Sequence, residues 1–174
     1  MEAVQHFLLN KLDLSLAHRQ TAKEMILNSG MEPADLIQLT NNADAKQKIR
    51  LLCFYDTFSR TSPEYFSTQL HTFVDWSANE KHETNKRSLT NIFLTFLKNK
   101  QYSFTTKQEE LITEVCFSWL IDDSLVATKS NCISCLTLLA KKYAWINEEL
   151  IPIIEQMYPN MPVSFQSRAR KILK

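Results

Sequence analysis

Hydrophobic residues recur along this chain with the spacing of amphipathic helices. In the clearest stretch, which ends near Asn99, the apolar residues follow the i, i+3, i+4, i+7, i+8 order without a miss, at Leu89, Ile92, Phe93, Phe96 and Leu97. Residues at these positions lie on one side of a helix, and that side is expected to face a core. The pattern therefore predicts helices that are buried along one face.

Similar stripes predict helices along the rest of the chain, with short breaks between them. In the second segment we expect Leu16 to face inward together with Ala22, Met25 and Ile26. The N-terminal third is the least regular part of the pattern. The expected segments are 4–12, 14–28, 33–39, 44–60, 63–74, 85–98, 106–121, 125–143, 147–158 and 163–173.

Several residues with strong preferences for helix ends mark the boundaries of these segments. Gly30 supplies the left-handed position that closes a helix. Asn42 or Asp44 can cap the helix that follows, because a short polar side chain accepts a hydrogen bond from the first turn. Asn147 is expected to cap the helix that ends near Tyr158.

Residues 115–157 contain the clearest helical hairpin. Only Asp122, Asp123 and Ser124 separate its two helices, so these helices must fold back on each other in a tight antiparallel turn. A capping box is expected at the start of the first helix, from Thr105 or Thr106 to Gln108 or Glu109.

Basic residues recur just inside alternate helices, at Arg50, Arg87, Lys129 and Arg168, with separations of 37, 42 and 39 residues. A period near 40 with two helices per unit is typical of HEAT and armadillo arrays. Each hairpin alone cannot bury its apolar face, so stacked hairpins form the core. The alternative is an irregular helical bundle in which the spacing of the bases is a coincidence.

Two fragments, Asp123–Lys129 and Asp44–Arg50, resemble the HEAT consensus, in which an acid between the helices precedes a valine and a base. The resemblance covers about residues 33–174. It implies an all-α fold, a right-handed α-α superhelix of HEAT/ARM type with about four helical hairpins. It also implies a single domain over 1–174, with 1–32 as an irregular N-terminal cap and 33–174 as repeats. In that family the acids and bases of successive repeats form a ladder along the inner layer.

The stretches CFSWLIDDSLVATK, WINEELIPIIEQM and SRARKIL more closely resemble a small bacterial family of stand-alone HEAT-like proteins. Members of that family are often labelled adenylosuccinate lyase. The lyase superfamily carries a signature loop rich in glycine and serine, which this far shorter chain lacks. We interpret the label as inherited by error.

Composition narrows the possible functions. The 174 residues contain one glycine, whereas phosphate-binding loops, dinucleotide fingerprints and nucleophile elbows need several at fixed spacing. A net charge of +1 gives no global attraction for nucleic acid or anionic lipid. Four cysteines inside apolar helical patterns indicate a reducing, cytoplasmic setting. No apolar run is long enough to cross a bilayer, so no membrane is expected as a partner.

No catalytic, cofactor or metal site is expected. Cys132 and Cys135 form a CxxC inside a helix, but no second pair of ligands lies near them in the sequence, so we interpret both as core residues. The four histidines are isolated from one another. Paired acids such as Glu109 and Glu110 lie where helix starts favour negative charge. The three tryptophans, Trp145 among them, are interpreted as packing residues.

The surface feature expected to matter is a separation of charge between alternate helices. Acids gather on the first helix of each pair and bases on the second, and the alternative is solvated charge with ion pairs inside each repeat. The leading hypothesis is a non-enzymatic scaffold whose basic inner layer receives an acidic segment of another protein. Binding of the nucleic-acid backbone, as in HEAT-type DNA alkylation-repair proteins, is the alternative. The candidate binding face consists of Lys46, Lys48, Arg50, Lys86, Arg87, Lys129, Arg168, Arg170 and Lys171.

Overall fold

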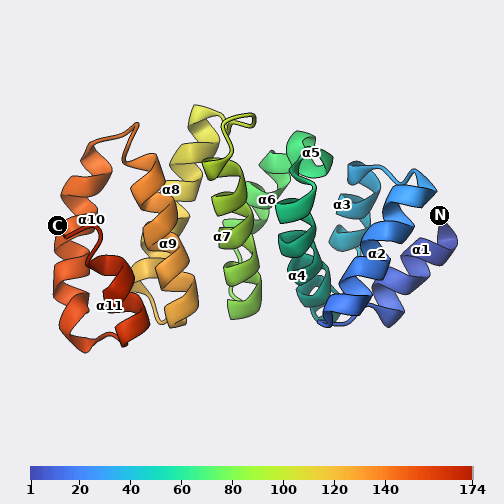
Figure 1. Ribbon diagram of the computed structural model, residues 1–174, viewed down its shortest axis with the longest axis horizontal. Coiled ribbons are helices and arrows are strands. Elements are labelled where there is room, and N and C mark those ends of the chain that lie inside the picture. The colour runs from blue at the N-terminus through green and yellow to red at the C-terminus, as the bar shows by residue number, and fades with distance from the viewer. Residues whose placement is uncertain (174) are drawn as a thin grey trace. The chain divides into compact units, whose positions relative to one another are not determined.

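The computed structural model describes residues 1–173, and within that range the chain forms helices and no strands (Figure 1). The chain divides into two compact units, Met1–Phe73 and the part that begins at Val74. The all-α fold predicted from the apolar stripes is confirmed.

The first unit consists of antiparallel helices whose ends follow the sequence signals. Gly30 has φ 68° and ends a helix in the left-handed region, as predicted. Asp44, one of the two proposed caps, accepts a hydrogen bond from the Gln47 backbone N–H at 2.7 Å. The elements are α1 Glu2–His6, η1 Phe7–Lys11, α2 Leu16–Ser29, α3 Pro33–Asn41, α4 Ala45–Thr61, α5 Pro63–Phe66, η2 Ser67–Gln69 and the start of α6 Leu70–Ser77.

An aromatic cluster forms the core of the first unit. Phe66 lies at its centre, with ring centroids 5.3 Å from Tyr55, 5.2 Å from Phe58 and 5.5 Å from Phe73. All four side chains are buried. Edge-to-face contacts of this kind add to the burial of apolar area, and together they attach α5 and α6 to α4.

The second unit is built around α9 Val126–Leu139, which contacts α7, α8, α10 and α11. Thr105 and Gln108 form the expected capping box at the start of α8, with backbone N–H to side-chain oxygen distances of 3.3 and 2.8 Å. The other elements are α7 Glu83–Lys98, α8 Thr106–Ile121, α10 Trp145–Met157, η3 Tyr158–Asn160 and α11 Val163–Ala169.

Hydrogen bonds between side chains and residues 38 positions away make the repeat visible. In the first unit, Arg19 donates to Thr57 and Arg50 donates to the Leu12 carbonyl over this separation. In the second unit, the Lys86 Nζ donates to the Ser124 hydroxyl over the same separation. A recurrent separation is expected when each helical pair contacts the pair before it. In the first unit, the Arg19 contact with this separation links α2 to α4.

Three local predictions were wrong. Asn147 lies inside α10 and does not cap it, because that helix begins two residues earlier at Trp145. Leu16 is 70% exposed, since α2 begins at this residue and its buried side consists of Ala22 and Ile26. The single helix expected over 63–74 is divided into α5, η2 and α6.

Candidate functional site

Four of the nine predicted face residues are held by contacts within their own unit. The Lys86 side chain is buried, and Arg50, Lys129 and Arg168 each donate to a backbone carbonyl of another segment. Lys48 is half-buried. The other four are exposed: Lys46, Arg87, Arg170 and Lys171.

Lys86 forms the centre of a polar network between α7 and the turn that joins α8 to α9. Its Nζ lies 3.1 Å from Glu83, 3.0 Å from Asp122 and 2.8 Å from the Ser124 hydroxyl. The ammonium group also lies 5.6 Å from the centroid of the buried Trp119 ring, in a cation–π position. Two carboxylates and an aromatic face together compensate the desolvation of the buried charge.

The pKa shifts in this network have the signs expected of an ion cluster. Burial alone would lower the pKa of Lys86, but hydrogen bonds to Asp122 and Glu83 outweigh it and raise that pKa above its usual value. Burial would raise the pKa of Glu83, but the Leu125 backbone N–H and Lys86 bring it below the usual value. The pKa of Asp122 is lowered likewise, against burial, by Ser124 and Lys86. All three groups are therefore charged at neutral pH.

Lys129 and Arg50 hold the ends of preceding helical segments. The Lys129 Nζ donates to the carbonyls of Leu120 and Asp122 at the C-terminal end of α8. The Arg50 guanidinium donates to the Leu12 carbonyl just after η1, at 3.1 Å. Cations at these positions satisfy carbonyls that have no partner within the helix and offset the negative end of the helix dipole. Both bases thus fix the hairpin turns.

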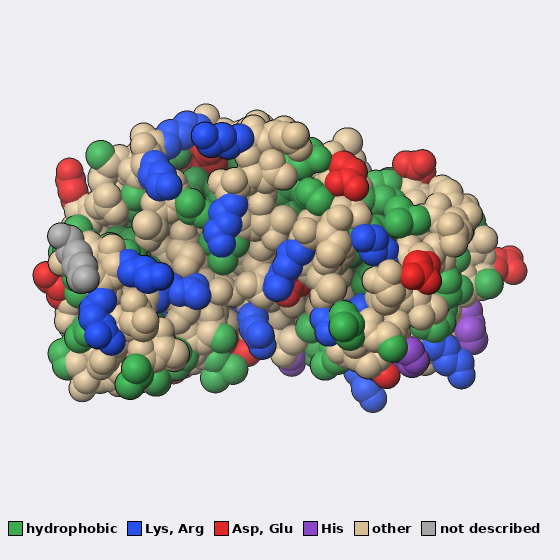
Figure 2. Space-filling view, in the orientation of Figure 1, with side chains coloured by type: hydrophobic (Ala, Val, Ile, Leu, Met, Phe, Trp, Pro, Cys, Tyr) green, Lys and Arg blue, Asp and Glu red, His purple; other side chains and the backbone are tan. Residues whose placement is uncertain are grey.

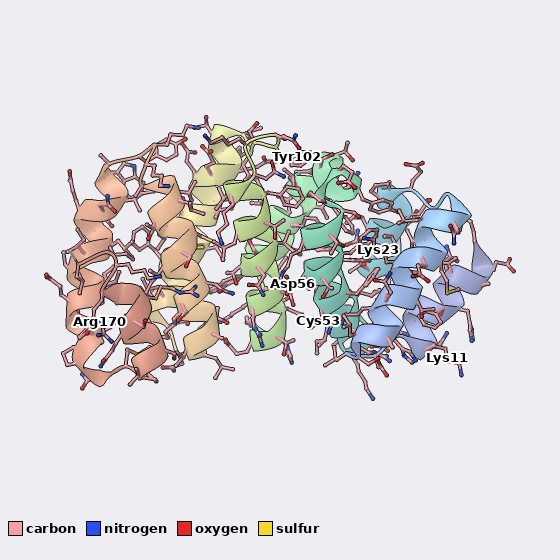
Figure 3. All side chains as sticks on the ribbon, in the orientation of Figure 1. Lys11, Lys23, Cys53, Asp56, Tyr102 and Arg170 are labelled. Atoms are coloured by element: carbon pink, nitrogen blue, oxygen red, sulfur yellow. The ribbon has the colours of Figure 1, made fainter. Side chains whose placement is uncertain are left out.

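A surface of the second unit runs across α7, α9 and α11, and we call it the α7–α9–α11 face. Asn131 of α9 donates to Asn91 of α7 at 2.9 Å, and Arg168 of α11 donates to Ser134 of α9 at 2.8 Å. Arg87 lies one helical turn before Asn91 and is exposed. Figure 2 shows Lys and Arg side chains gathered over these helices of the unit, with few Asp and Glu among them. Arg170 lies at the end of α11 (Figure 3).

Two bases of the first unit were missed by the sequence analysis. Arg19 of α2 donates to Thr57 of α4 at 2.7 Å. Lys23, one turn later, donates to Thr61 at 2.9 Å and lies over the Phe58 ring at 5.6 Å (Figure 3). Both bases lie within 1–32, which was predicted to be an N-terminal cap and was not searched for a binding face, and both contacts span 38 residues.

The cysteines have the structural place that the sequence predicted. Cys132 and Cys135 are fully buried in α9, beside Cys116 of α8. A hydrogen bond to the Cys116 thiol and burial raise the pKa of Cys132 well above its usual value. Within residues 1–173, no group of three or more His, Cys, Asp or Glu side chains is placed to hold a metal ion.

The acids expected at helix starts include one with a different role. Glu109 is buried in the first turn of α8 and accepts hydrogen bonds at 2.6 Å from both the Lys142 ammonium and the Tyr143 hydroxyl. It therefore connects α8 to the turn that follows α9. Trp145, expected to pack, stacks on the Phe117 ring but remains 47% exposed.

Comparison with known proteins identifies one family. The family model described as a HEAT repeat domain matches residues 9–174. Neither the curated proteins nor the solved structures contain a match. HEAT repeats commonly mediate protein interactions. None of the helices in the described part of the chain is long and apolar enough to span a bilayer.

Proposed function

Because the chain belongs to the HEAT repeat domain family, we propose that it is a non-enzymatic scaffold whose α7–α9–α11 face receives an acidic segment of another protein. The observation that carries the proposal is the exposed positive charge on this face. Within residues 1–173, Arg87 and Lys171 make no hydrogen bond or ion pair with their side chains, and Arg170 contacts only a backbone carbonyl of its own helix. These cations are available to carboxylates of a partner.

The buried and carbonyl-bound bases have a supporting role in this proposal. Lys86 fixes the turn between α8 and α9, and Arg168 attaches α11 to α9. Arg87 is therefore carried on α7, and Arg170 and Lys171 directly follow α11, and these helices are each attached to α9. Positioned charges bind a complementary segment at a lower entropic cost than mobile ones do.

A labelled acidic peptide tests the proposal directly. The probe is a short fluorescein-labelled poly-glutamate peptide, and its binding is followed by anisotropy at several salt concentrations. In the variant Arg87→Glu/Arg170→Glu/Lys171→Glu three favourable contacts are lost. At about 0.5 kcal/mol each they amount to about tenfold in affinity.

The matched control replaces three exposed lysines at or near helix ends with glutamate, namely Lys100, Lys107 and Lys141. It therefore has the same net charge as the Arg87→Glu/Arg170→Glu/Lys171→Glu variant. We expect this control to bind within about twofold of the wild type. An equal loss in both variants would show a general charge effect and contradict the proposal. Tighter binding of a labelled DNA duplex than of the peptide, with a steep salt dependence, would favour the nucleic-acid alternative instead.

A non-enzymatic scaffold should lack the adenylosuccinate lyase activity after which members of the similar bacterial family are often labelled. Incubation of the purified protein with adenylosuccinate is expected to release no fumarate. Fumarate release above that of a buffer blank, and lost with heat denaturation of the protein, would contradict a purely non-enzymatic role.

A further inference from the structure

The second unit has a groove between α8 and α10 whose lining differs in chemistry from the α7–α9–α11 face. Its volume is about 460 Å³. Its apolar lining includes Phe117 and Ile121 of α8 and Trp145 and Ile153 of α10, and the Phe117 and Trp145 rings stack at 6.4 Å with an interplanar angle of 26°. We call it the α8–α10 groove.

The apolar lining is unusually open to solvent. Ile121 is 66% exposed and Trp145 is 47% exposed. Soluble proteins rarely expose contiguous apolar surface, and where they do it commonly marks an interaction site. The groove continues into a second hollow that shares Ile121 and Ile153 and adds Met157 and Met161. Tryptophan is also a residue type that dominates binding energy at interfaces.

All charged residues that line the groove are acidic. They are Glu110, Glu114 and Glu149, each exposed and, within the described residues, without a hydrogen bond or ion pair from its side chain. Glu110 and Glu114 are four residues apart on α8, an arrangement of like charges that destabilises a helix by a few tenths of a kcal/mol. A bound cation would relieve this repulsion. The charge therefore selects a basic partner and disfavours an anionic membrane surface.

The shape of the groove fits a helix. Glu110, Glu114, Phe117 and Ile121 form one stripe along α8, with spacings of four, three and four residues. This stripe is about 16 Å long at 1.5 Å per residue, or about three helical turns. A partner helix of about three turns can therefore lie along the groove and place apolar residues at i, i+3, i+4 and i+7 against it.

We propose that the α8–α10 groove binds a basic amphipathic helix of a partner protein, with its apolar side against Phe117, Ile121, Trp145 and Ile153 and its Lys or Arg residues against the three glutamates. The proposal adds a second interaction surface to the scaffold. It does not depend on the α7–α9–α11 face, and its test uses other residues.

The test uses a fluorescein-labelled helical peptide. Its leucines are spaced alternately three and four residues apart, so that they form one apolar side of the helix, and its lysines lie along both flanks of that side. We expect it to bind the full-length protein. Glu114→Lys/Glu149→Lys and Trp145→Ala should each weaken binding by about tenfold or more. The matched control is Glu148→Lys/Glu155→Lys, which reverses two exposed acids of α10 that do not line the groove and gives the protein the same net charge, and it should bind within about twofold of the wild type. Far-UV circular dichroism checks that each variant is folded.

Four results would overturn the proposal. The first is an equal loss of affinity in Glu148→Lys/Glu155→Lys, which would show a general charge effect. The second is equal binding of a peptide in which glutamates replace the lysines. The third is self-association of the protein that Trp145→Ala abolishes, which would make a second copy the occupant. Binding to vesicles of anionic lipid through Trp145 would likewise contradict the choice of a basic helix.

Discussion

Replacing Lys86 with methionine is expected to destabilise the second unit more than replacing an exposed base. The substitution keeps most of the side-chain volume but leaves Glu83 and Asp122 without their cation. Removing one member of a buried ion pair costs about 3–5 kcal/mol. The side chains of Glu83 and Asp122 remain 29% and 38% exposed, so water takes over part of their solvation. We therefore expect a loss of about 2 kcal/mol, which lowers the melting temperature by about 4–8 °C in a chain of this size.

Thermal and urea unfolding followed by circular dichroism measures this loss at neutral pH. The matched control is Arg87→Met, because Arg87 is the next residue on α7 and is exposed. Exposed substitutions of this kind change stability by no more than about 0.5 kcal/mol. If Lys86→Met also stays within about 0.5 kcal/mol of the wild type, the network does not stabilise the turn between α8 and α9 and the reasoning is refuted.

The pH dependence of the difference gives a second check on the same network. The pKa values of Glu83 and Asp122 are lowered by folding from 4.5 and 3.8, so their stabilisation is complete above these values and is lost as the pH falls through the folded-state pKa values. Lys86 has a raised pKa, so its contribution is complete below 10.5 and is lost only as the pH rises through the folded-state value. The difference in unfolding free energy between the wild type and Lys86→Met should therefore decrease as the pH falls through the folded-state pKa values of Glu83 and Asp122.

Three further outcomes follow from particular contacts. Tyr55→Phe should cost about 1 kcal/mol, measured by urea unfolding, because the buried Tyr55 hydroxyl loses its hydrogen bond to Thr40 at 2.7 Å; a stability equal to that of the wild type would contradict this. Thr105→Ala should cost about 0.5–2 kcal/mol in the same assay, through loss of the cap of α8, and a stabilising effect would be inconsistent with the capping box. Cys116 and Cys132 should resist a thiol reagent in the folded protein and react only on unfolding, whereas the half-buried Cys53 reacts first; early labelling of Cys132 would contradict its burial.

The fold could be predicted from the sequence because its determinants are local. The apolar stripe of 89–97 lies within α7, and four of its five residues are fully or almost fully buried, Leu97 being half-buried. The capping box at Thr105 and the left-handed Gly30 are also defined by neighbouring residues. Signals that depend only on residues close together in the sequence can be recognised without knowing how the helices pack.

The roles of the bases could not be predicted in the same way. Lys86 is buried because the turn that contains Asp122, 36 residues later, packs against α7. Nothing near Lys86 in the sequence distinguishes it from its exposed neighbour Arg87. The partial exposure of Trp145 was not predicted, because Asn147 was taken as the cap and Trp145 was placed outside the helix. In the structure it opens α10 and faces a groove whose other wall is supplied by Phe117 and Ile121 of α8.

Two separate titrations on one set of variants test most directly whether the second unit carries two surfaces of opposite charge. The poly-glutamate peptide should lose about tenfold in affinity only in Arg87→Glu/Arg170→Glu/Lys171→Glu, relative to the control that reverses Lys100, Lys107 and Lys141. Among the charge variants, the lysine-flanked helical peptide should lose about tenfold only in Glu114→Lys/Glu149→Lys, relative to Glu148→Lys/Glu155→Lys. If each control loses as much affinity as the variant it matches, binding follows net charge alone, and the assignment of two surfaces is contradicted.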